Sequence, residues 1–160
     1  MTQKAIVAKT LLTALPRMHE FVQHLRLKNY ATGIASIEST MNTEMVCARI
    51  IDRIIRQNQI LDLKVRVRSL IESLPERYKG ILHHHYVQGK LIKDFAKKIQ
   101  VTERTAIRQL REAEKIFARN IGLIINTFML SDLVRKHKWF KAELERHFYG
   151  VCRANSGSRK

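Results

Sequence analysis

The sequence is poor in the residues that interrupt helices. It contains two Pro and six Gly among 160 residues, and apolar side chains recur at spacings of three and four along most of its length. No segment predicts a β-strand convincingly. We therefore expect an all-α protein, a helical bundle in which a long helix precedes a helix-turn-helix domain.

Cysteines and long apolar runs are equally scarce. Cys47 and Cys152 lie far apart and without CxxC spacing, which favours neither a disulfide scaffold nor a zinc knuckle and fits a reducing cytoplasm. The longest apolar run, Ile121 to Leu130, is interrupted by Asn126 and Thr127 and falls short of the roughly 20 residues that span a bilayer. We expect a soluble, cytoplasmic protein without a membrane partner.

Acidic residues are few, with 14 Asp and Glu against 30 Lys and Arg and a formal net charge of +16. Such an excess favours a polyanionic partner, and nucleic acid is the first candidate. A basic protein of the membrane surface would also carry this charge, but neither a clear lipidation signal nor one exposed amphipathic helix is evident.

The motifs that carry catalysis are missing as well. GxxxxGK[ST], GxGxxG, GxSxG and HExxH do not occur, and the carboxylates are scattered rather than clustered as in a nuclease. The run His83-His84-His85 invites a metal, but consecutive helical side chains point about 100° apart and do not converge on one ion. We expect no enzyme, no cofactor and no metal site.

Breaks in the helical pattern predict the division of the chain. Pro16 kinks or starts a helix within residues 5–29, residues 31–43 predict a connector, and residues 44–74 a long helix that ends at Leu74-Pro75-Glu76. The apolar stripe of this long helix requires a partner, either the N-terminal helix or the same helix of a second subunit. Ser131-Asp132 predicts the cap of a final helix that ends near Gly150.

Four regions follow from these breaks. We expect an N-terminal helical scaffold and dimerisation region (1–74), a DNA-binding domain (75–121), an accessory helix (122–150) and a disordered basic tail (151–160). Two aromatic pairs in the third region, Trp139-Phe140 and Phe148-Tyr149, predict either core or a docking surface.

Residues 91–117 carry the pattern of a helix-turn-helix. The buried edge of a first helix is predicted at Leu91, Phe95 and Ile99, and the small Ala96 allows close packing. The turn is predicted at Gln100-Val101-Thr102. Val101 is expected between the two helices, and Thr102 is expected to cap the second one. In that second helix, residues spaced by three and four predict one apolar face, formed by Ala106, Leu110, Ala113 and Phe117.

The opposite face of the second helix is basic, as a helix that enters the major groove requires. We assign base contacts to Glu103, Arg104, Ile107 and Arg108, and phosphate contacts to Arg111, Lys115 and three nearby lysines. With the capping turn included, the predicted DNA-binding residues are Thr102, Glu103, Arg104, Thr105, Ile107, Arg108, Arg111, Lys115, Lys90, Lys93 and Lys97.

These residues also resemble known families. Three segments are similar to sigma-70 region 4: Leu74-Pro75-Glu76-Arg77-Tyr78, His85-Tyr86-Val87-Gln88-Gly89 and Val101-Thr102-Glu103-Arg104-Thr105. With Thr43-Glu44-Met45 and Ile60-Leu61-Asp62-Leu63-Lys64 added, residues 40–121 resemble the RinA/ArpU family of phage transcriptional activators. The glycine common in the turn of sigma-like motifs is Gln100 here, which predicts a strained turn.

The resemblance implies a phage or prophage regulator that acts with host RNA polymerase to switch on late genes for packaging, morphogenesis or lysis. We expect double-stranded DNA at a promoter or operator as its partner, and a homo-oligomer, since paired half-sites multiply affinity. Two alternatives stay open: a small sigma-like factor, for which a promoter-melting helix is missing from residues 1–70, and a non-catalytic RNA- or DNA-binding structural or packaging protein.

Overall fold

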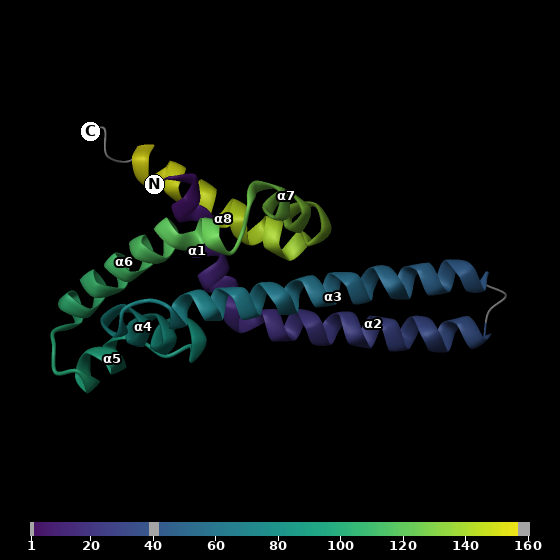
Figure 1. The fold of residues 1–160 in the computed structure, drawn as a ribbon, viewed down its shortest axis with the longest axis horizontal. Coiled ribbons are helices and arrows are strands. Elements are labelled where there is room, and N and C mark those ends of the chain that lie inside the picture. Colours follow the sequence, from purple (N-terminus) through teal and green to yellow (C-terminus); the bar gives the residue numbers. More distant parts are fainter. Residues whose placement is uncertain (1, 39–41, 157–160) are drawn as a thin grey trace. The chain divides into compact units, whose positions relative to one another are not determined.

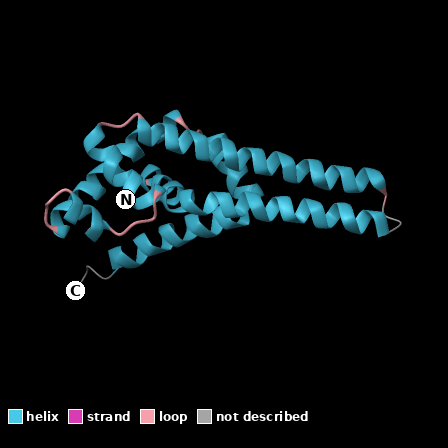
Figure 2. Cartoon of the chain, turned by 90° about the horizontal axis from the view of Figure 1, so that it is seen from below, coloured by secondary structure: helices cyan, strands magenta, loops and turns pink. Residues whose placement is uncertain are grey.

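The structure is a computed structural model that describes residues 2–38 and 42–156. Every regular element in this part of the chain is a helix, and it contains no strand (Figure 2), so the expected all-α class is confirmed. The chain packs as two units, one made of Met1–Pro16 together with Arg66–Lys160 and the other of Arg17–Val65.

The helices follow one another with short connections (Figure 1). In chain order they are α1 (Gln3–Ala14), α2 (Met18–Glu38), α3 (Thr43–Glu72), α4 (Glu76–Leu82), α5 (Ile92–Lys98), α6 (Glu103–Asn120), α7 (Thr127–Lys136) and α8 (Lys138–Ser156). Single helical turns lie at η1 (Leu15–Arg17), η2 (His83–Val87) and η3 (Ile121–Leu123).

The unit Arg17–Val65 is a hairpin of α2 and the first part of α3, which run side by side in both views (Figures 1 and 2). The connector predicted over residues 31–43 is wrong for residues 31–38, because α2 continues through Gly33 to Glu38, and residues 39–41 of that connector lie outside the described residues. Contacts remote in sequence explain the difference: the Arg53 guanidinium donates hydrogen bonds to the Lys28 carbonyl, at 2.8 Å, and to the Thr32 hydroxyl. The expected helix start at Thr43 is confirmed.

The long helix α3 is confirmed and ends before Pro75. Its apolar stripe divides into two parts. Ile60, Leu63 and Val67 are buried within the chain, whereas Ile51 and Ile54 are 56% and 44% exposed. Within the described residues, the second part of the stripe is thus buried and the first part is largely open to solvent.

Helix α6 is the centre of the other unit. Helices α1, α4 and α5 pack against it, and α1 and α7 pack against α8. Phe117 of α6 and Phe140 of α8 are fully buried. The two units divide residues 1–74, the expected scaffold, because α1 belongs to the unit of α4–α8 and α2 belongs to the other unit.

The C-terminal region differs from its prediction. Ser131 and Asp132 lie inside α7, whose cap is Asn126: its Oδ1 accepts the Met129 N–H at 2.8 Å. His137 is extended and separates α7 from α8, so two helices replace the single accessory helix. The tail expected to be disordered from residue 151 continues α8 to Ser156, and residues 157–160 lie outside the described part. The helix end expected near Gly150 is wrong, since α8 continues past it, and a glycine inside a helix costs only about 1 kcal/mol relative to alanine.

In the part of the chain that is described, no single helix has the length and apolar character to cross a membrane. The segments Glu103–Leu123 and Thr127–Lys136 reach that level only when taken together, and a bend of 99° separates them.

Candidate nucleic-acid interface

The turn between α5 and α6 is a Schellman motif built on Gln100. The N–H of Val101 donates to the Ala96 carbonyl at 3.0 Å and the N–H of Gln100 to the Lys97 carbonyl at 3.3 Å, the two hydrogen bonds that define this helix ending. Gln100 has a φ of 55°, in the left-handed region that glycine adopts without steric cost. The strained turn expected from the sequence is confirmed.

Gln100→Gly is expected to raise the free energy of unfolding by about 1 kcal/mol, because it relieves the left-handed strain at Cβ. For a chain of this size the melting temperature should rise by about 2 to 4 °C, measured by circular dichroism. Gly89, with a φ of 67°, supplies the reverse control: Gly89→Ala should lower the melting temperature. A decrease with Gln100→Gly would contradict the strain.

Helix α6 begins as predicted. Thr102 is its N-cap, and the Thr102 hydroxyl accepts the Thr105 N–H at 3.3 Å. Ala106, Ala113 and Phe117 are fully buried, and Leu110 is half-buried, which confirms the predicted apolar face. These contacts fix the rotation of α6 about its axis and leave its other face to solvent.

The predicted buried edge of α5 is only partly correct. Phe95 and Ala96 are buried, but Leu91 is 68% and Ile99 38% exposed. Helix α5 starts at Ile92, so Leu91 precedes the first turn and has extended backbone, and Ile99 lies at the other end in the non-helical cap. A helix of seven residues buries its middle against α6 and leaves both ends uncovered.

Four basic residues form the exposed face of α6, called here the basic face: Arg104, Arg108, Arg111 and Lys115, all exposed. Their spacings of four, three and four residues place them on one side of the helix. Among the described residues no carboxylate lies within ion-pair distance of Arg104, Arg108 or Arg111. The basic face therefore carries uncompensated positive charge.

A surface depression lies along the first turns of α6. Glu103, Arg104, Thr105, Ile107, Arg108 and Arg111 line one depression on this side of the helix. Ile107 lies between the two arginines 36% exposed, so an apolar surface is available within a basic one. Such a surface is complementary to base edges in the major groove, because arginine can donate to the acceptors of guanine and an apolar side chain can contact the methyl group of thymine.

The other carboxylates of α6 are used within the fold. Glu112 pairs with Arg77 of α4 at 2.9 Å, and Glu114 pairs with Lys9 of α1 at 3.6 Å and accepts the Tyr86 hydroxyl at 2.5 Å. Burial and the negative charge of Glu114 raise the pKa of Tyr86 far above its ordinary value. Acidic side chains thus anchor α6 to its neighbours and leave the opposite side basic.

The predicted lysines Lys90, Lys93 and Lys97 are all exposed. Lys93 and Lys97 lie one helical turn apart on α5, and Lys90 lies in the loop before it. A loop and a short helix next to the basic face suit phosphate contacts, which need charge more than shape. No hydrogen bond or ion pair brings these lysines into contact with α6 in the described residues.

The histidine run has a role that the sequence did not predict. His84 Nε2 donates to the Leu91 carbonyl at 3.2 Å, and His85 Nδ1 to the Lys90 carbonyl at 3.1 Å. Both bonds hold the loop that precedes α5. A π-helical turn over His83–Val87 places these rings beside the loop. The spacing of residues in the sequence does not predict such a turn. In the described part of the chain, no group of three His, Cys, Asp or Glu side chains could hold a metal ion.

A polar contact of Thr13 with His147 links α1 to α8. His147 Nε2 lies 3.0 Å from the Thr13 hydroxyl and 3.4 Å from Glu143 Oε1. Burial lowers the pKa of His147, an effect that Glu143 opposes and Lys9 and Arg146 reinforce. Burial thus favours the neutral form of His147 in the folded protein.

The stability of the fold should accordingly fall in mild acid. A histidine whose pKa is lower when folded binds more protons when unfolded, so its contribution is complete above the unfolded pKa of about 6.5 and is lost as the pH drops below it. We expect the urea midpoint to be lower at pH 5.5 than at pH 7.5, and the difference to shrink in His147→Gln. An equal pH dependence in the two proteins would contradict this assignment.

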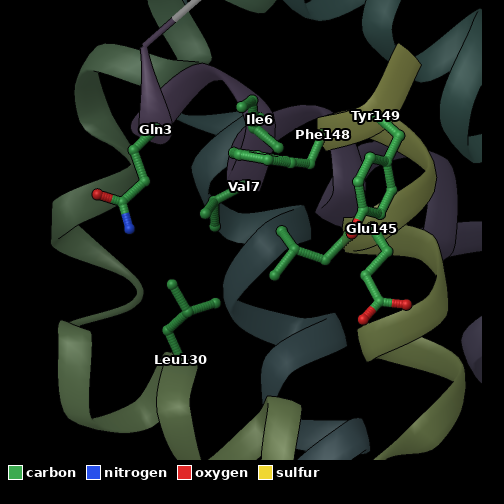
Figure 3. A pocket seen from close by; sticks show the side chains of 8 residues that line it. Gln3, Ile6, Val7, Leu130, Glu145, Phe148 and Tyr149 are labelled. Atoms are coloured by element: carbon green, nitrogen blue, oxygen red, sulfur yellow. The ribbon is translucent and has the colours of Figure 1, made fainter. Parts of the chain in front are cut away.

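The aromatic pairs of α8 differ in burial, and the core role is shown for Phe140. Phe140 is fully buried, whereas Phe148 and Tyr149 are 53% and 64% exposed. Together with Ile6, Val7 and Leu130 they line a cavity of about 410 Å³ between α1, α7 and α8 (Figure 3). Its lining is mostly apolar, with polar atoms from Gln3, Glu145 and the Tyr149 hydroxyl.

Comparisons of this chain with protein-family models, curated proteins and solved structures found no match. The candidate interface therefore rests on the geometry of α5, the turn and α6.

Proposed function

We propose that this chain is a non-catalytic, sequence-specific DNA-binding transcription regulator that inserts α6 into the major groove of double-stranded DNA. The observation that carries the proposal is the basic face of α6, which is exposed and uncompensated on the side opposite the buried Ala106, Ala113 and Phe117. A helix presented in this way by a preceding short helix and tight turn suits groove binding.

Within this proposal the residues divide by their distance from the start of α6. Glu103, Arg104, Ile107 and Arg108 occupy the first two turns and read base edges, since the N-terminal end of such a helix enters the groove. Arg111, Lys115 and the lysines of the α5 region hold phosphates. The net charge of +16 supplies the sequence-independent part of the affinity.

The biological setting follows from the sequence resemblance to sigma-70 region 4 and to RinA/ArpU activators. On that basis we propose an activator of phage or prophage late genes that binds near a promoter in the bacterial cytoplasm and acts with host RNA polymerase. A small sigma-like factor would use the same α5–turn–α6 segment. Activation, as opposed to repression, is proposed from the resemblance alone, since the basic face would serve either.

Selection of bound duplexes from a random DNA pool, at near-physiological salt, tests the proposal. The selected sequence should bind at least about a thousandfold more tightly than its scrambled control. Nearly equal binding to all duplexes would favour the general nucleic-acid-binding or packaging alternative. A preference for RNA over duplex DNA would also overturn the proposal.

A further inference from the structure

The hairpin of α2 and α3 residues 43–65 keeps an apolar face exposed. Leu27, Tyr30, Ile34 and Ile37 follow one another on α2 at spacings of three and four residues, and Ile34 and Ile37 are 61% and 85% exposed. This is the spacing with which a helix packs along another helix. So many large apolar side chains on one exposed surface mark an interaction site.

Both helices contribute to this face. Tyr30, Ile34 and Ile37 of α2 and Ile50 and Ile54 of α3 line one groove of about 650 Å³, called here the hairpin groove. Gly33 also lines it, and a Cβ at Gly33 would meet no atom within 4 Å. The missing side chain lets another helix backbone approach closely at this point.

The charge of the hairpin distinguishes between possible occupants. Residues 17–65 carry seven Lys and Arg against five Asp and Glu, so most of the excess positive charge of the chain lies elsewhere. Nucleic acid has little attraction to this nearly neutral surface. A second hairpin would meet little overall repulsion.

The charges are also unevenly placed along the hairpin. The end that contains the α2–α3 connection, residues 29–52, carries Glu38, Glu44 and Asp52 against Arg49 alone. The other end, residues 17–28 and 53–65, carries six Lys and Arg against Glu20 and Asp62. Two hairpins that run in opposite directions would therefore bring each acidic end against a basic end.

We propose that two copies of this chain pair through their hairpin grooves about a twofold axis, with the hairpins antiparallel, to form a four-helix bundle. A twofold interface requires a self-complementary surface, and the apolar groove with opposite charges at its two ends is one. The pairing itself does not depend on DNA. Its use, two α6 helices on one operator, rests on the proposed function.

Sedimentation equilibrium of the full chain without DNA tests the pairing. The unchanged protein should be a dimer at micromolar concentration. Ile34→Glu and, separately, Ile37→Glu should each raise the dimer dissociation constant at least about a hundredfold, because the lost apolar burial occurs twice in a symmetric dimer. Leu123→Glu, at a side chain 78% exposed in the other unit, is the matched control and should remain a dimer.

Circular dichroism should show equal helix content in all four proteins, since the substituted side chains are exposed. An unchanged protein that is monomeric over the micromolar range, or dimers that persist in both hairpin variants, would overturn the pairing. Arg108→Ala should leave the dimer intact. A failure of the dimer is thereby distinguished from a failure of DNA binding.

Disulfide trapping tests the direction of the hairpins in a Cys152→Ser background. Ile54 is the middle residue of 43–65 and lies near the twofold axis of an antiparallel pair, whereas the exposed Cys47 lies toward one end. Mild oxidation should link Cys47→Ser/Ile54→Cys chains and leave chains with Cys47 alone unlinked, since a disulfide needs Cα atoms within about 7 Å. The reverse result would indicate parallel hairpins and overturn the arrangement.

Discussion

Arg108→Ala is expected to cost about 1 to 3 kcal/mol of binding free energy on the selected duplex and much less on scrambled DNA. Arg108 lies on the second turn of α6, exposed, with no carboxylate of the described residues in ion-pair distance. A guanidinium in that position can donate two hydrogen bonds to a guanine edge, which alanine cannot replace. Arg104→Ala should behave in the same way, and fluorescence anisotropy at fixed salt measures both.

Lys115→Ala is the matched comparison on the same helix face. Lys115 lies two turns further along α6, where phosphate contact is expected, so its loss should weaken specific and scrambled duplexes alike. The slope of affinity against salt should also fall by about one. Equal losses on both duplexes for Arg108→Ala would contradict its assignment to base reading.

Phe117→Ala is expected to lower the free energy of unfolding by about 3 to 5 kcal/mol. Phe117 is fully buried on α6, the helix against which α1, α4 and α5 all pack, and alanine would leave a cavity there. Because domains of this size are stable by only about 5 to 15 kcal/mol, the variant should be near its unfolding threshold at 37 °C. Urea unfolding followed by circular dichroism provides the measurement.

Ile107→Ala provides the control for packing on the same helix. Ile107 is 36% exposed and lies on the solvent side, so its truncation should change the unfolding free energy by well under the cost at Phe117. Similar losses for the two variants would mean that α6 is rotated relative to the structure described above.

The turn and the buried face of α6 could be predicted from the sequence because their signals are local, whereas the two ends of α5 could not. Thr102 caps the helix that follows it, Gln100 stands where the backbone turns left-handed, and Ala106 and Phe117 repeat with the helical period. Each of these features depends on residues within a few positions along the chain. The exposed face of α6 follows directly once its buried face is known.

The predictions that failed depend on partners distant in sequence. Thr32 and Gly33 resemble a connector until Arg53 of α3 is placed against α2. The first sixteen residues gave no local sign that α1 packs on α6 and α8. The bonds from His84 and His85 to the loop before α5 depend on a π-helical turn that no spacing rule anticipates.

The insertion of the hairpin between α1 and the rest of its unit affects how the protein folds during synthesis. Helix α1 packs on α6 and α8, which start at Glu103 and Lys138, so the ribosome reaches them on the order of 5 to 25 s after it completes α1 at ordinary translation rates. Until then Leu11 and Leu12 of α1, fully buried in the finished protein, have no native partner. The nascent chain thus exposes a short apolar helix of the kind that chaperones bind, while the contiguous hairpin behind it is free to fold at once.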